Sequence, residues 1–130
     1  LEMASKNAPE ESGGFLQVSG VTYTIDTSIP TSVKLDEKGN FLGVSEAYRV
    51  TDVMVNGEPL DLNRTYTVSS HNYMLKSAGD GMTMFAGAKI LKDEVMVDVD
   101  ALSDYINTYL GGNVGAEYAN PLGQGRITIK

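Results

Sequence analysis

The segment YRVTDVMVNGEPL, residues 48–60, carries the strongest local signal of fold in the chain. Apolar and polar residues alternate along it, but the phase slips: Tyr48 shares one face with Val50, whereas the later valines share the other. A β-bulge near Thr51-Asp52 would reconcile the two phases, because one extra residue turns the following side chains over. Asn56-Gly57 is the dipeptide that two-residue hairpin turns favour. We therefore expect a bulged strand over Tyr48 to Val55 that ends in a tight turn.

The partner of this strand is expected downstream. After a connection over Glu58 to Asn63, the run from Arg64 to Ser70 alternates threonine and serine with Tyr66 and Val68. Such period-2 alternation is typical of a strand with one buried face. We expect this run to pair back on the first strand.

Further elements follow from the same patterns. Period-2 alternation and turn residues predict short strands over Phe15 to Val18, Val21 to Ile25, Val33 to Leu35, Phe41 to Val44 and Ile127 to Ile129. Residues 85–91 and 94–97 fit either short strands or irregular core segments. Leu1 to Asn7 is typical of the end of a helix, with Pro9 preventing its continuation. Because so short a helix is marginal alone, we expect either that its first part lies upstream or that it packs firmly on the sheet. Together these elements predict an α+β fold in which helices pack on a mixed, mostly antiparallel, twisted sheet.

One longer helix is predicted late in the chain. Leu102, Tyr105, Ile106, Tyr109 and Leu110 fall on one helical face and form an apolar stripe. Such a stripe usually faces the core, so we expect the two tyrosines to be buried there. Asp98 or Asp100 would cap the first turn, and Gly111-Gly112 would end the helix. A loop rich in glycine, asparagine and proline, Asn113 to Gly125, then leads to the last strand.

Composition narrows the functions that the chain can have. Its 130 residues are enough for one domain with a real core. The net charge of −7 comes without a basic stripe, which disfavours nucleic acids and anionic membranes as partners. Cysteine is absent and His71 is the single histidine, so thiolate and His-rich metal sites are excluded. The acidic residues have no metal-binding spacing, and no apolar run reaches the roughly 20 residues of a membrane span.

The segment SSHNYMLKSAGDGMTMF, residues 69–85, holds the most specific candidate site. Asp80 lies between Gly79 and Gly81, so two residues without side chains let a ligand or another backbone come close to its carboxylate. A carboxylate only accepts hydrogen bonds, which suits a pair of hydroxyl groups. An aromatic ring, Tyr73, lies shortly upstream and could hold a flat ring. The alternative is an ordinary surface turn, which is the commonest use of Asp-Gly.

Two other residues are open to both functional and structural interpretations. Phe15 follows Gly13-Gly14 at the predicted start of a strand, where it could pack in the core or face a ligand. His71 lies next to Asn72 at the end of a predicted strand. It could touch a ligand, but a structural role is favoured because no catalytic partner motif accompanies it.

Three motifs occurring in order resemble the C-terminal domain of the 5′-nucleotidase family. They are GGFLQVSG at residues 13–20, the hairpin segment at 48–60 and the segment at 70–85. The resemblance runs from residue 1 to Lys130, where GQGRITIK looks like the usual end of the domain. The family includes UDP-sugar hydrolases, 2′,3′-cyclic-nucleotide phosphodiesterases and 5′-nucleotidases. The resemblance implies a fragment of a longer enzyme, cut inside the first helix of this domain.

The resemblance implies a role in recognising the nucleoside part of a substrate. Phe15 matches a first ring that stacks on the base, and Tyr73 matches the second ring, with Met74 as the alternative at that position. Asp80 matches an aspartate that binds the ribose hydroxyls. The further substrate-binding residues that we expect are Gly79, Gly81, Gln17 and Asn72. A domain that keeps the fold as a structural module without nucleotide binding is the alternative.

The resemblance also implies what lies outside these residues. An N-terminal metallophosphatase domain would hold two divalent metal ions and hydrolyse the phosphoester of nucleoside 5′-phosphates or related compounds. The 130 residues themselves would bind neither metal nor cofactor and would have no catalytic power. Their partners would be a nucleoside or nucleotide and that N-terminal domain. Family members imply an extracellular, cell-surface or periplasmic location.

Overall fold

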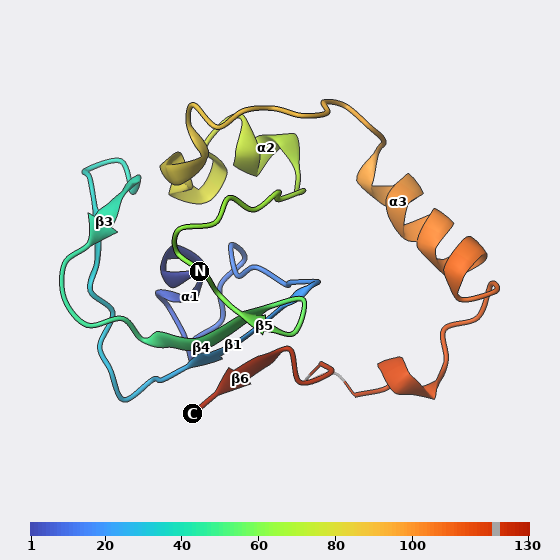
Figure 1. The fold of residues 1–130 in the computed structure, drawn as a ribbon, viewed down its shortest axis with the longest axis horizontal. Coiled ribbons are helices and arrows are strands. Elements are labelled where there is room, and N and C mark those ends of the chain that lie inside the picture. The colour runs from blue at the N-terminus through green and yellow to red at the C-terminus, as the bar shows by residue number, and fades with distance from the viewer. Residues whose placement is uncertain (121–122) are drawn as a thin grey trace.

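A four-stranded mixed sheet forms the centre of the computed structural model, which describes residues 1–120 and 123–130 (Figure 1). Its strand order is β5 (Glu58–Pro59), β4 (Val50–Val55), β1 (Val21–Ile25) and β6 (Ile127–Ile129). β1 pairs antiparallel with β4, and β4 pairs antiparallel with β5. β6 adds to the other edge of β1 in parallel. The mixed, mostly antiparallel sheet of an α+β fold is therefore confirmed.

The bulge and the tight turn of the 48–60 segment are both present. Thr22 lies opposite Met54 and Thr24 lies opposite Thr51, so Asp52 and Val53 together oppose the single residue between the two threonines. Asp52 takes a left-handed conformation with a φ of 52°. Asn56 and Gly57 are left-handed as well, with φ of 51° and 84°, which is the pattern of a type I′ turn.

A second, two-stranded sheet lies beside the first. Its strands, β2 (Val33–Leu35) and β3 (Phe41–Val44), pair antiparallel as predicted. Asp36 holds the turn between them: its carboxylate accepts hydrogen bonds from the backbone N–H of Lys38 at 2.9 Å and of Asn40 at 2.8 Å, and from the Asn40 side chain. These bonds, the Asn40 side chain first, lower the pKa of Asp36.

The first helix, α1 (Glu2–Ser5), is buried along its whole length and contributes Met3 and Ala4 to the first of two hydrophobic clusters. The Glu2 carboxylate accepts a hydrogen bond from the backbone N–H of Val50 at 2.8 Å, which ties the helix to β4. The buried members of the first cluster are Met3, Ala4 and Met82, and those of the second are Ala8, Tyr23 and Ile25. The expectation that this short helix packs firmly on the sheet is confirmed.

The remaining helices are short. They are α2 (Asn72–Leu75), the 3₁₀ turns η1 (Gly79–Gly81) and η2 (Thr83–Phe85), α3 (Asp98–Asp104), the π-helical turn η3 (Tyr105–Tyr109) and the 3₁₀ turn η4 (Ala116–Tyr118). α3 and η3 together occupy the predicted late helix, and Gly111 and Gly112 end it with φ of 64° and 79°. The loop predicted over Asn113 to Gly125 is interrupted by η4, and its residues 121–122 lie outside the described part of the chain.

Two predicted strands are wrong. Phe15 to Val18 forms no strand, and β4 and β6 occupy both edges of β1. Its side chains pack instead on both clusters, Phe15 on the second and Leu16 on the first. Arg64 to Ser70 does not pair back either, since β5 already holds the free edge of β4. Val68 stays exposed, so no buried face fixes a register for this run.

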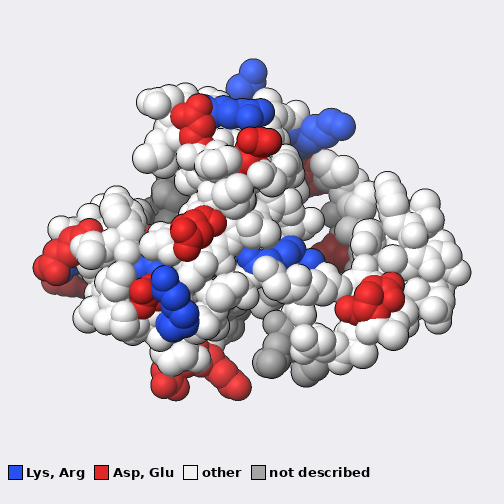
Figure 2. All heavy atoms as spheres, turned by 60° about the horizontal axis from the view of Figure 1, so that its bottom comes forward, with Lys and Arg blue, Asp and Glu red and all other residues white. Residues whose placement is uncertain are grey.

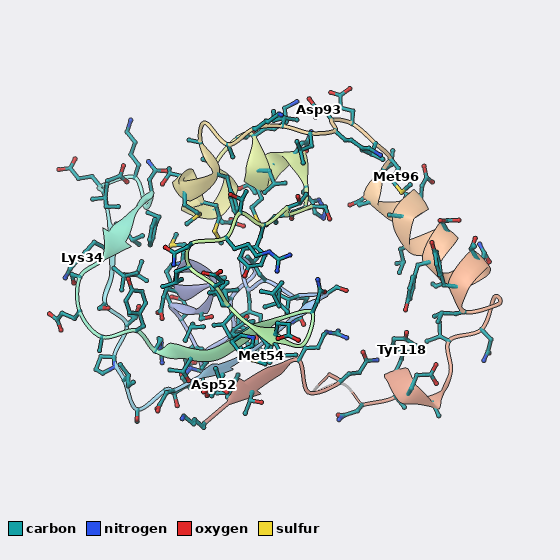
Figure 3. All side chains as sticks on the ribbon, viewed as in Figure 1. Lys34, Asp52, Met54, Asp93, Met96 and Tyr118 are labelled. Atoms are coloured by element: carbon teal, nitrogen blue, oxygen red, sulfur yellow. The ribbon has the colours of Figure 1, made fainter. Side chains whose placement is uncertain are left out.

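The predicted burial of the late helix is also wrong. Leu102 is 60% exposed and Tyr109 is 73% exposed, because α3 lies away from the sheet at the end of a long connection (Figure 1). The tyrosines pack on one another instead of on the core: the Tyr105 and Tyr109 rings stack at 5.6 Å, and the Tyr105 hydroxyl lies 3.1 Å from that of Tyr118. Figure 3 labels Met96 just before α3 and Tyr118 on η4, beyond the other end of the helix.

The capping and connecting residues of this region differ from expectation too. Val97 is the N-cap of α3, and Asp98 and Asp100 lie inside its first turn, where a negative charge still suits the helix dipole. The connection that precedes it contains no strand between residues 86 and 97 and is not a core segment. Its large apolar residues are exposed, namely Ile90, Leu91, Val95, Met96 and Val97.

Candidate functional site

The Gly79-Asp80-Gly81 turn is held rigidly by the core below it. Met82, the next residue, is buried in the first cluster, and its backbone N–H donates to the Gly79 carbonyl at 3.1 Å. Gly81 adopts a φ of 76°, and a side chain there would clash with the carbonyl oxygen of Gly39 in the β2–β3 turn. Asp80 itself is left-handed, with a φ of 53°. The surrounding contacts thus fix the conformation from which its carboxylate projects.

Asp80 is exposed and lies against the glycines that precede Phe15. A Cβ atom built on Gly14 would stand 3.3 Å from the Asp80 Oδ2 atom. The carboxylate has no hydrogen-bond or ion-pair partner among the residues that the structure describes. Two motifs that are 65 residues apart in sequence, at positions 15 and 80, therefore meet in space, with an acceptor left free between them.

The ring of Tyr73 lies against Gly79, the residue before Asp80. It packs directly over Gly79, so that any side chain on that glycine would overlap the ring. The ring is 57% exposed and presents a free surface. Met74, the alternative for the stacking position, is partly buried and packs on the first cluster. Of the two neighbours, Tyr73 is the one with a face available to a ligand.

Phe15 and Gln17 line a separate, open cleft of about 560 Å³. Phe15 packs on the second cluster with part of its surface and borders the cleft with the rest. Neither Tyr73 nor Asp80 lines this cleft. The structure thus brings Asp80 next to Gly14 and Tyr73 over Gly79, without placing the side chains of Phe15, Tyr73 and Asp80 in one cavity.

Other predicted residues take peripheral positions. Asn72 is exposed at the first position of α2. His71 precedes it as the N-cap residue, and its Nδ1 atom lies 3.9 Å from Asp98. Lys76, at the end of α2, forms a 2.6 Å ion pair with Asp93 on the connection toward α3, where Figure 3 labels Asp93. Both are surface contacts between the site segment and residues 93–98, and neither buries α3.

Charges near the site do not suggest a metal centre or a polyanion surface. No group of three or more His, Asp or Glu side chains among the described residues could hold a metal ion. On the face drawn in Figure 2, basic and acidic side chains are interspersed. Within the described part of the chain, no helix is long and apolar enough to cross a membrane.

Several residues at these surfaces were not foreseen from the sequence. Glu10, Glu11 and Ser12 line the cleft beside Phe15, and Gly14 makes room for Asp80. Their place in a polar, glycine-ended loop directly before Phe15 was the available signal. A second cleft of about 310 Å³ lies at α1 and is bordered mainly by apolar residues, including Leu16, Phe41 and Met82.

Comparison with known proteins identifies the family. The model of the 5′-nucleotidase C-terminal domain matches residues 1–87, which contain Phe15, Tyr73 and Asp80. The chain belongs to the 5′-nucleotidase C-terminal domain family. The motifs at 13–20, 48–60 and 70–85 all fall inside the matched part, so the resemblance that they indicate is confirmed.

A curated relative agrees with this assignment to the 5′-nucleotidase family. The chain is 27% identical over 105 residues to the trifunctional nucleotide phosphoesterase protein YfkN of Bacillus subtilis (strain 168). The match covers 81% of this chain but only 7% of that protein. No solved structure matches the chain significantly. That the domain extends over all of residues 1–130 stays a prediction.

Proposed function

We propose that this chain binds the nucleoside part of a nucleotide substrate. Phe15 and Tyr73 stack on the two faces of the base, and the Asp80 carboxylate accepts hydrogen bonds from the ribose hydroxyls. The observation that carries the proposal is the exposed Asp80 carboxylate, which lies beside Gly14 and directly follows Gly79, the glycine that the exposed Tyr73 ring covers. Gly79 and Gly81 are required for that geometry, because side chains at either position would clash.

The reaction belongs to a different part of the enzyme in this proposal. A metallophosphatase domain of the same protein binds two divalent ions, which polarise the phosphoester and activate water. The substrates are nucleoside 5′-phosphates or related phosphoesters, in keeping with the family and with the name of the Bacillus relative. The protein acts outside the cytoplasm, at the cell surface or in the periplasm.

The expected affinity of the domain alone is low. Stacking contributes roughly 1–3 kcal/mol per base face. Two faces and a diol clamp, less the cost of association, would leave about −4 kcal/mol, which corresponds to a millimolar dissociation constant. Tight binding would need the contacts that the metal centre makes with the phosphate.

A titration of the labelled chain with AMP, followed by NMR, tests the proposal. We expect saturable shifts of the amides of Phe15, Tyr73 and Asp80, with a dissociation constant in the millimolar range. Tyr73→Leu and Asp80→Asn should each weaken binding several-fold. Tyr109→Leu is the control, since Tyr109 is also exposed, at 73% against 57% for Tyr73, but lies on η3. Absence of shifts up to tens of millimolar AMP would refute it.

A structural module without a nucleoside site is the second candidate. It is favoured by the cleft beside Phe15, which Tyr73 does not line. In that case Tyr73→Leu in the complete enzyme would lower thermal stability and leave kcat/KM unchanged. Nucleoside recognition predicts the opposite, a fall in kcat/KM at nearly constant stability.

A further inference from the structure

Four buried polar side chains meet where α1 packs on the central sheet. Glu2 and Ser5 come from α1, Tyr23 comes from β1, and Arg49 directly precedes β4. Each of these residues is at most 8% exposed, and each has one side-chain nitrogen or oxygen atom without a hydrogen-bond partner among the described residues. Burying a polar atom without a partner is costly, so four such atoms in one place point to a further bonding partner.

Contacts among these residues bring the four atoms together. The Arg49 Nη1 atom donates a long hydrogen bond of 3.5 Å to the Ser5 carbonyl oxygen. The Glu2 carboxylate accepts a hydrogen bond from the backbone N–H of Val50, the residue after Arg49. Glu2 and Ser5 are three residues apart and share one face of the helix. Burial raises the pKa of Tyr23, and the neighbouring Ser5 side chain opposes that rise. The two hydroxyl groups are therefore close, although they form no hydrogen bond of ordinary geometry.

The four atoms include donors and acceptors, which restricts the kind of molecule that could satisfy them. Arg49 Nε only donates hydrogen bonds, the ionised Glu2 carboxylate only accepts them, and the two hydroxyl groups can do both. The guanidinium would repel a metal ion, and the carboxylate would repel an anion. Among the described residues, Glu2 and Arg49 form no ion pair with each other. A small neutral molecule that both donates and accepts fits the cluster, and water has these properties.

We propose that an internal water molecule bridges these four side chains. It accepts hydrogen bonds from Arg49 Nε and from the Tyr23 hydroxyl. It donates one hydrogen bond to the Glu2 Oε2 atom and one to the Ser5 hydroxyl, so that all four of its bonding positions are used. Buried waters typically make about three hydrogen bonds to polar groups that would otherwise lack a partner. Polar groups that lie near one another without bonding directly are commonly joined in this way.

The bridged helix also supports the turn that carries Asp80. Met3 packs with Met82 in the first cluster, and its Cε atom lies 3.0 Å from the position of a Cβ atom built on Gly81. The water therefore holds in place the helix on which the Gly79-Asp80-Gly81 turn rests. This role is independent of the proposed function, because it requires no nucleoside.

A high-resolution crystal structure of the complete chain tests the proposal directly. We expect one ordered water within about 2.7–3.2 Å of at least three of the four atoms. Direct hydrogen bonds among the four side chains, with no water between them, would overturn the proposal. A metal ion or an anion at this position would overturn it as well.

A double-mutant cycle tests the same bridge in solution. Tyr23→Phe and Glu2→Gln each remove one partner of the water, and each should raise the equilibrium constant of unfolding in urea about tenfold. Because the two side chains interact through the water, their effects should not multiply. The double variant should fall short of the product of the two single effects by a factor of about five or more.

Tyr23→Phe combined with Asp36→Asn is the control pair. Asp36 bonds only within the turn between β2 and β3, so it shares no partner with Tyr23, and the two effects should multiply. Independent effects of Tyr23→Phe and Glu2→Gln would overturn the bridge. If a variant fails to fold, the crystal structure of the unaltered chain decides the question alone.

Discussion

At the scale of single residues, the candidate site depends on glycines that leave no room for a side chain. Gly79 is covered by the Tyr73 ring, and Gly81 presses on the Gly39 carbonyl of another turn. Gly14 accommodates the Asp80 carboxylate. Each contact joins segments distant in sequence, so these glycines position the site as well as bending the backbone.

Replacing Gly81 by alanine should separate these two effects. Gly81 and Gly87 have nearly the same φ, 76° and 78°, but nothing lies within 4 Å of a side chain built on Gly87. Gly87→Ala should therefore cost only the conformational strain, about 1–2 kcal/mol. Gly81→Ala should cost about 1–3 kcal/mol more, since the Gly39 turn must move. Urea unfolding measures both, and equal losses would show that the close approach has no energetic weight.

Asp52 offers a second test on one residue, because it holds the bulge in β4 in a left-handed conformation. Asp52→Gly should stabilise the chain by up to about 1 kcal/mol, since glycine adopts this φ without strain. Asp52→Val should destabilise it by about 1–3 kcal/mol, because a β-branched residue fits that conformation badly. Thermal unfolding of both variants gives the sign. A valine variant as stable as the glycine variant would contradict the bulge.

At the scale of elements, local signals predicted structure well and pairing partners poorly. The bulge, the Asn56-Gly57 turn and the glycines after η3 each act through backbone conformations encoded within a few residues. Phe15 to Val18 and Arg64 to Ser70 alternate as well as real strands do. Whether such a run pairs depends on a free sheet edge, and β5 and β6 occupy the edges they would need. The sequence does not contain that information locally.

The candidate site shows the same division. Asp80 between two glycines and Phe15 after two glycines are visible as motifs in the sequence. Their meeting at Gly14 is a tertiary contact that no pattern predicts. The choice between Tyr73 and Met74 likewise depends on which neighbour the first cluster takes in, and it takes Met74. Glu10 and Glu11 belong to the cleft only because the fold brings their loop and Ile129 of β6 to the same surface.

The turn between β2 and β3 should make stability depend on pH through Asp36. Hydrogen bonds lower its pKa from the ordinary value of 3.8. The folded state therefore favours the carboxylate: the contribution is complete above the unfolded pKa and is lost as pH falls through the lower, folded value. Asp36→Asn should remove this part of the acid sensitivity, seen as a smaller fall in melting temperature below about pH 4. Glu37→Gln in the same turn is the control, and identical pH curves for wild type and Asp36→Asn would contradict the assignment.

At the scale of the whole molecule, the chain divides into a packed body and an exposed excursion. α1, the two sheets and the site segment share the two hydrophobic clusters. Residues 86–120 leave this body, form α3, η3 and η4, and the chain returns as β6 (Figure 1). The apolar stripe of the excursion faces solvent, and its tyrosines stack on one another. Periodicity identifies an apolar helix face but not what covers it, and for this reason the predicted burial in the core is wrong.

Amide hydrogen exchange should reveal this division directly. The amides of β1, such as that of Tyr23 bonded to the Arg126 carbonyl at 3.0 Å, should exchange only on global unfolding. Those of α3 should exchange roughly a thousandfold faster or more, because two helical turns without tertiary packing are marginal in water.

Leu102→Ala should then change stability by less than about 0.5 kcal/mol, whereas Ile25→Ala in the second cluster should cost about 2–5 kcal/mol. Protection of α3 equal to that of β1, together with a large loss on Leu102→Ala, would show that the stripe is buried in solution, since only tertiary contacts could supply that stability.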